Sequence, residues 1–168
     1  MGSKERLYAD IMAVHPEVTG SCNLVIVKQP DNTTVKFIVD CGLFQERKYS
    51  KNNESLPFIP ANIDFCLVTH NHVDHVGRLP FLVSKGFDKE IFISETTSKL
   101  LPLALEDSHK VLRDVAKRQN RPCLYTESDV AQTMKLIRPC KYNQTVQIRP
   151  NIKATFFQNG HLMGPQAF

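Results

Sequence analysis

The sequence predicts a layered α/β domain, and the order of its elements is the main reason. Strand-like segments come first, followed by a strand-helix unit, further helices, and strands again. That order favours helices packed on a sheet over a helical bundle or an all-β sandwich. With 168 residues, of which 42% are hydrophobic, the chain is long enough for one domain with its own apolar core.

The first elements predicted are a β-hairpin, a loop and a buried strand. Leu24–Lys28 and Val35–Val39 are rich in β-branched residues, and the turn-forming sequence between them, 29–34, favours an antiparallel pair. The polar stretch 40–60 has no sustained period and is predicted to be a loop. Ile63–Thr69 is a short apolar run that predicts a buried strand.

The remaining elements are predicted from helical spacing and from short β-forming runs. Apolar residues at helical spacing predict one helix over Asp74–Lys85, with Pro80 near its first turn and Gly86 as its stop. A longer helix is expected to start at Ser94 and to run through Val115. The other expected elements are a strand at Ile91–Ile93, a helix at Glu127–Ile137, and strands at Val146–Ile148 and Lys153–Phe157.

Composition places the chain among soluble globular proteins. The sequence has neither the roughly 18 consecutive apolar residues that a membrane helix needs nor the pattern of a signal peptide, so we expect a cytoplasmic protein without a membrane partner. The formal net charge of +4 is compatible with a polyanionic partner but decides little. Five widely spaced cysteines without a C-x-x-C pair predict reduced, mostly buried thiols.

The segment 69–75 (THNHVDH) carries the most specific chemical signal. His70 and His72 are two residues apart after a predicted strand, so both imidazoles can converge on one cation, and Asp74 and His75 can face a second cation nearby. Imidazole nitrogen and carboxylate oxygen suit zinc, and they also suit manganese or iron. The alternative is a surface cluster of histidines. It is disfavoured because three of the six histidines fall within six residues directly after a buried strand.

Two distant residues complete the candidate site. His161, between Gly160 and Gly164, would be a turn residue if taken alone, but beside a two-histidine site it becomes the candidate third imidazole. Asp40 ends the second predicted strand, where it could cap a turn or accept a hydrogen bond from a ligand histidine and fix its tautomer. We predict catalytic roles for Asp40 and Asp74, the latter also orienting the nucleophile.

These residues resemble the motifs of the metallo-β-lactamase superfamily, with Asp40 as the first motif, 70–75 as the second and His161 as the third. Further segments resemble one branch, the β-CASP nucleases, which are relatives of the cleavage-and-polyadenylation endonuclease and of ribonuclease J. These segments are 17–22, 39–45, 105–108, 125–127 and 160–164.

The resemblance implies a four-layer αββα sandwich with two zinc ions. In it, His70, His72 and His161 would hold one ion, and Asp74 and His75 the other. Residues 1–168 would be the N-terminal part of this domain, without the β-CASP insert and the C-terminal part that carry the remaining ligands. We therefore expect this fragment to be weakly active or inactive by itself.

The function expected from the resemblance is zinc-dependent hydrolysis of RNA phosphodiester bonds by a hydroxide that two metal ions activate. RNA is then the expected partner of the full-length protein, and a homo-oligomer is left open. One alternative is a thioesterase or another small-molecule hydrolase of the same superfamily. Another is a subunit of an RNA-processing complex that has no catalytic activity.

Overall fold

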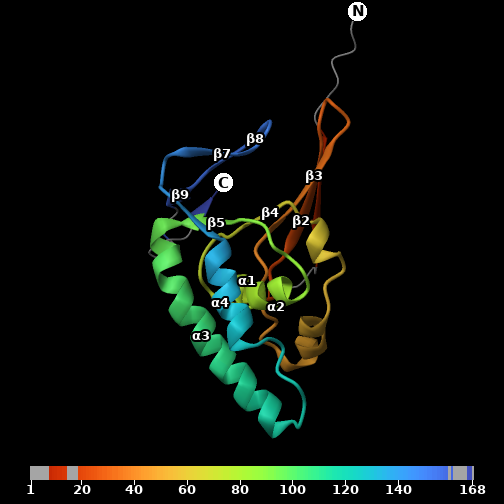
Figure 1. The fold of residues 1–168 in the computed structure, drawn as a ribbon, viewed down its shortest axis with the longest axis vertical. Coiled ribbons are helices and arrows are strands. Elements are labelled where there is room, and N and C mark those ends of the chain that lie inside the picture. The colour runs from red at the N-terminus through yellow and green to blue at the C-terminus, as the bar shows by residue number, and fades with distance from the viewer. Residues whose placement is uncertain (1–7, 15–18, 159, 161–165, 168) are drawn as a thin grey trace, which may run out of the picture.

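A six-stranded sheet forms the centre of the computed structural model, which describes residues 8–14, 19–158, 160 and 166–167 (Figure 1). The strand order is β1-β2-β3-β4-β5-β6. Strands β1, β2 and β3 pair antiparallel, while β4, β5 and β6 continue the sheet in parallel from β3. The strands are β1 Tyr8–Ala13, β2 Asn23–Lys28, β3 Thr34–Val39, β4 Phe65–Leu67, β5 Ile91–Ser94 and β6 Ile137–Cys140.

Both faces of the sheet are covered, because successive residues of a strand point to opposite faces. On one face Cys66 and Ile91 belong to an apolar core shared with α2 Leu79–Ser84, α3 Glu95–Arg118 and α4 Glu127–Leu136. On the other face Phe65, Leu67 and Phe92 pack against residues from the β7–β8 hairpin and its flanks. Figure 1 shows the helices and this hairpin on opposite sides of the sheet. The small strands are β7 Thr145–Arg149, β8 Ile152–Thr155, β9 Phe157–Gln158 and β10 Gln166–Ala167.

The layered α/β prediction is thus confirmed. The described residues contain three successive layers, namely helices, the large sheet and a small sheet, and the second helical layer of an αββα sandwich is not among them. No helix of the described residues is long and apolar enough to cross a membrane. All five cysteines are free and four of them are buried, as the sequence predicted.

Both long helices begin at a capping residue, and for α3 this residue is the predicted Ser94. The hydroxyl of Ser94 accepts a hydrogen bond from the backbone N–H of Thr97 at the start of α3. Helix α3 then continues through Pro102 to Arg118. At α4, Thr126 and Asp129 form a reciprocal capping box.

The prediction of a single helix over Asp74–Lys85 is wrong. The structure divides it into α1 Val73–Val76 and α2 Leu79–Ser84. Pro80 lies at the N-terminus of α2, where its missing N–H and fixed φ favour a helix start over a helix interior. The backbone N–H of Arg78 donates instead to the carbonyl of Cys41, 2.8 Å away.

Three other segments differ from prediction. Strand β1 was missed because all of its residues are exposed, so no apolar alternation marks it, and β6 was missed because it contains Pro139. The predicted loop 40–60 contains a 3₁₀ helix at Arg47–Glu54, and a second one follows at Pro60–Asn62. Such short helices carry little apolar periodicity, which is why the sequence pattern did not indicate them.

Candidate metal centre

The candidate centre lies where two parallel neighbours, β3 and β4, end side by side. Val39 pairs with Leu67 in the last register position, so Asp40 and Val68 leave the sheet at the same edge. The chain beyond β4 passes through Thr69 and His70 and then enters α1. Strand ends of this kind are the usual place for sites in open α/β sheets.

Backbone hydrogen bonds fix the segment 40–43 against the turn that carries the histidines. The N–H of Cys41 donates to the carbonyl of His75 at 2.8 Å, and the N–H of Leu43 donates to the carbonyl of Val73 at 2.9 Å. Gly42 lies between them so close to α1 that a Cβ added to it would lie 1.6 Å from the carbonyl oxygen of Asp74. Only glycine permits this approach, so the sequence Asp-Cys-Gly sets the position of the turn.

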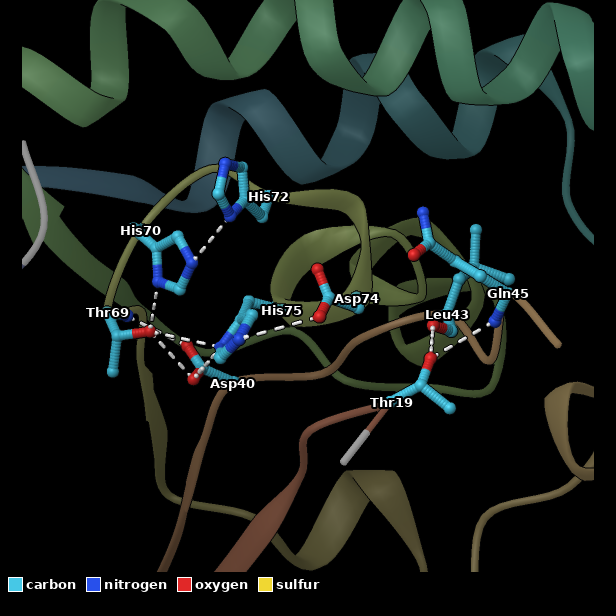
Figure 2. A network of polar contacts seen from close by, with 9 residues as sticks. All are labelled: Thr19, Asp40, Leu43, Gln45, Thr69, His70, His72, Asp74 and His75. Atoms are coloured by element: carbon cyan, nitrogen blue, oxygen red, sulfur yellow. Dashed lines mark hydrogen bonds and ion pairs between the residues drawn. The ribbon is translucent and has the colours of Figure 1, made fainter. Parts of the chain in front are cut away.

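The carboxylate of Asp40 is the hub of the polar network in Figure 2. Asp40 is buried and has a left-handed backbone, with φ of 64°. Its Oδ1 accepts from the backbone N–H of Thr69 at 2.8 Å, and its Oδ2 accepts from the Thr69 hydroxyl at 2.8 Å and from Nδ1 of His75 at 2.7 Å. These three hydrogen bonds satisfy the buried carboxylate, so Asp40 needs no metal ion as a partner.

Thr69 connects His70 to the same carboxylate. Nδ1 of His70 lies 2.9 Å from the Thr69 hydroxyl oxygen. Since the single hydroxyl proton of Thr69 is directed to Asp40, the oxygen is free to accept from Nδ1–H of His70. Both His70 and His75 therefore carry their proton on Nδ1, and both leave Nε2 as the atom able to bind a cation.

His70 and His72 face each other through their ring nitrogens, with Nε2 of His70 3.1 Å from Nδ1 of His72 (Figure 2). Two nitrogens bound to one tetrahedral zinc at about 2.0–2.1 Å would lie about 3.3 Å apart. The observed separation is close to that value, so this pair fits a shared cation.

Asp74 and His75 form a second pair on α1. Nε2 of His75 lies 3.8 Å from Oδ2 of Asp74, and both side chains are partly exposed. Burial lowers the pKa of His75, but the hydrogen bond and charge of Asp40, together with the charge of Asp74, outweigh it and raise the pKa above its ordinary value. The second pair has the ligand types that a divalent cation takes, and the bond to Asp40 fixes the orientation of the His75 ring.

The structure thus brings Asp40, His70, His72, Asp74 and His75 to one edge of the sheet, whereas His161 lies outside the described residues. Within 8–14, 19–158, 160 and 166–167, no group of three or more His, Cys, Asp or Glu side chains is arranged to hold a metal ion. The described residues therefore supply two pairs of potential ligands, and the third imidazole remains a prediction.

Sequence reasoning assigned no role to Thr69 or Arg78. Thr69 lay inside the motif, but only its bonds to Asp40 and His70 reveal its part in setting a tautomer. Arg78 is 1% exposed; its Nε donates to the carbonyl of Gly42, 2.6 Å away, and its Nη1 donates to the carbonyl of Asn52, 3.0 Å away. This buried arginine, which forms no ion pair with a carboxylate of the described residues, ties the segment 40–43 to the 3₁₀ helix at 47–54. No sequence pattern indicates such a contact.

Residues 18–133 match the sequence profile of a protein family, the Metallo-beta-lactamase superfamily. The chain is 31% identical over 148 residues to Ribonuclease TTHA0252 of Thermus thermophilus. This match covers 88% of this chain and 31% of that protein. It is 29% identical over 157 residues to Endoribonuclease ysh1 of Aspergillus fumigatus, with 90% of this chain and 17% of that protein covered. The chain therefore spans less than a third of the length of these two curated relatives.

Among solved structures, a metallo-beta-lactamase of Cronobacter sakazakii has the same fold. The match has a TM-score of 0.52 at 18% identity and covers 93% of this chain and 54% of that one. The family match covers well over half of the chain and includes the turn 69–75 as well as Asp40. The chain therefore belongs to the metallo-beta-lactamase superfamily.

Proposed function

We propose that this chain carries the metal-binding part of a zinc-dependent ribonuclease of the β-CASP branch. The observation on which the proposal rests is the pair of ring nitrogens, His70 Nε2 and His72 Nδ1, that face each other at 3.1 Å. In the structure a hydrogen bond joins these two nitrogens, and a bound cation would take the place of that contact. The names of the relatives, Ribonuclease TTHA0252 and Endoribonuclease ysh1, support RNA over a thioester as substrate.

In this proposal His70, His72 and His161 hold one zinc ion, and Asp74 and His75 hold the second. Bound divalent cations supply an activated water and neutralise the charge that develops on phosphate oxygens. Asp40 acts through its neighbours: it keeps Nδ1 of His75 protonated and, through Thr69, Nδ1 of His70 as well. Asp74, partly exposed beside His75, orients the attacking water.

The proposal is tested by zinc titration in competition with a chromophoric chelator. His70→Ala should abolish the tighter zinc site. Asp40→Asn keeps the size of the side chain but weakens its bond to His75, and it should lower affinity at the weaker site about 10- to 100-fold, as is usual when a partner of a ligand histidine is lost. Asp64→Asn is the matched control. Asp64 accepts a hydrogen bond from the backbone N–H of Lys36 in β3, and it forms no hydrogen bond with the proposed metal ligands.

Unchanged zinc affinity in both His70→Ala and Asp40→Asn would contradict the assigned centre. The substrate is tested separately, by comparing cleavage of labelled single-stranded RNA with hydrolysis of a thioester by the zinc-loaded full-length protein. Faster thioester hydrolysis would favour a small-molecule hydrolase. We expect the 168-residue chain to turn over weakly, since Asp74 and His75 give the second cation only two protein ligands.

A further inference from the structure

We propose that a groove along α3 binds the RNA strand on its way to or from the candidate metal centre; this inference rests on the proposed function and names the path of its substrate. The groove begins beside His72 and ends at exposed cations near the C-terminus of α3. Its three parts are hollows that share the residues between them.

The first hollow, of about 530 Å³, opens beside the centre. Asn71, His72 and Val73 from the histidine turn line one side of it, and α3 lines the other with Ala104, Leu112 and one carboxylate, Asp107. A volume of this order is typical of small-molecule sites, with apolar walls and a few polar groups. It therefore has the size and the lining to receive a base of a strand whose phosphate lies at the centre.

The wall of this hollow opposite α3 is fixed before any ligand binds. The side chain of Asn53 accepts from the N–H of Phe44 at 2.8 Å and donates to the carbonyl of Phe44 at 3.0 Å. The hydroxyl of Thr19 accepts from the N–H of Gln45 at 3.2 Å and donates to the carbonyl of Leu43 at 3.4 Å (Figure 2). A wall held in this way loses little conformational entropy on binding.

The hollows are continuous along α3. A second hollow, of about 160 Å³, shares Phe44, Asn53 and Leu112 with the first. It shares Ala116 and Arg121 with a third hollow of about 560 Å³. From Ala104 to Lys117 the groove follows about 20 Å of α3, at 1.5 Å per helical residue.

The far end of the groove is cationic. Arg113 and Lys117 lie on successive turns of α3, are exposed, and line the third hollow together with Arg121. Nη1 of Arg121 pairs with Oε1 of Glu54 at 2.7 Å, whereas no carboxylate among the described residues forms an ion pair with Arg113 or Lys117. These two cations are available for phosphate groups.

The occupant that fits is a single strand of RNA. A site of proposed phosphodiester hydrolysis at one end, an apolar hollow beside it and unpaired cations at the other end match a polyanion with exposed bases. Proteins that bind single strands combine a cationic track for the backbone with surfaces for the bases.

The experiment measures binding of a labelled phosphorothioate decamer of RNA, which resists cleavage, to the zinc-loaded chain by fluorescence anisotropy over a range of salt concentrations. Arg113→Ala combined with Lys117→Ala should weaken binding roughly tenfold and reduce the slope of log affinity against log salt by about 1.4, or about 0.7 for each phosphate lost. Ala104→Trp, which fills the first hollow, should weaken binding to a similar degree.

Two matched controls lie on the same helix outside the groove, namely the exposed residues Lys99, as Lys99→Ala, and Leu103, as Leu103→Trp. Both should bind the decamer as the unaltered chain does. The groove is overturned if the double variant and Ala104→Trp bind like these controls, or if the decamer does not bind while zinc does. Zinc titration of the same preparations keeps the two proposals separate, because failure to bind zinc would instead overturn the metal centre.

Discussion

The histidine turn and the helical layer of this molecule are held by different kinds of interaction. The turn 69–78 is fixed by backbone hydrogen bonds to 40–43, by the buried Asp40 carboxylate and by Gly42 in close contact with α1. Helices α2, α3 and α4 are held mainly by apolar burial against the sheet. Hydrogen bonds and close approach fix positions within tenths of an ångström, whereas apolar packing tolerates small changes, so the site depends on the first kind of interaction.

The largest effect that we expect tests the turn. Gly42→Ala places a Cβ 1.6 Å from the carbonyl oxygen of Asp74, and backbone must move to relieve the clash. The free energy of unfolding should fall by about 4 kcal/mol or more, the range of exceptional substitutions, and zinc binding should be lost. Urea denaturation measures the first and chelator competition the second.

The control for this change is Gly86→Ala. Gly86 has φ of 101°, but the nearest atom to an added Cβ is 3.8 Å away, so only backbone strain remains and the cost should be about 1–2 kcal/mol. Equal losses for the two alanine variants would mean that close approach at Gly42 does not define the turn.

The next effect tests the helical layer. Leu101→Ala removes a fully buried side chain from the core under α3 and should lower the free energy of unfolding by about 3 kcal/mol. Zinc affinity should stay within about twofold of the unaltered chain, because Leu101 takes part in none of the hydrogen bonds that fix the turn. Leu103→Ala, on a residue that is 70% exposed, should change stability by less than about 0.5 kcal/mol. A large loss of zinc affinity in Leu101→Ala would mean that the histidine turn also depends on the apolar packing of the helical layer.

The smallest effect concerns alkaline stability of the helical layer. Burial raises the pKa of Tyr125 from 10.0 to about 12, against the opposing hydrogen bond to Ser108. The unfolded chain then loses this proton near pH 10 and the folded protein near pH 12. This difference does not affect the free energy of unfolding below pH 10. Between pH 10 and pH 12 it lowers the free energy of unfolding by about 2.7 kcal/mol in total.

Tyr125→Phe should therefore flatten the decline of the free energy of unfolding between pH 9 and 11, measured by urea denaturation. Zinc binding near neutral pH should be unchanged. An equally steep decline in the phenylalanine variant would show that other groups cause the alkaline loss.

The sequence by itself determined the layered α/β class, helices α3 and α4 and the β2–β3 hairpin, and it indicated the residues of the candidate centre. It did so because these features depend on local signals: periodicity, capping side chains, and a cluster of ligand types within six residues. It did not reveal β1, the break between α1 and α2, or the roles of Thr69 and Arg78.

Those features were decided by tertiary structure, because each depends on a partner distant in sequence. Strand β1 exists through its pairing with β2. The break at Arg78 places its N–H on the carbonyl of Cys41 and its side chain on the carbonyl of Gly42. The tautomers of His70 and His75 follow from Asp40, some thirty residues earlier in the chain, and only the parallel pairing of β3 with β4 brings that carboxylate to the histidines.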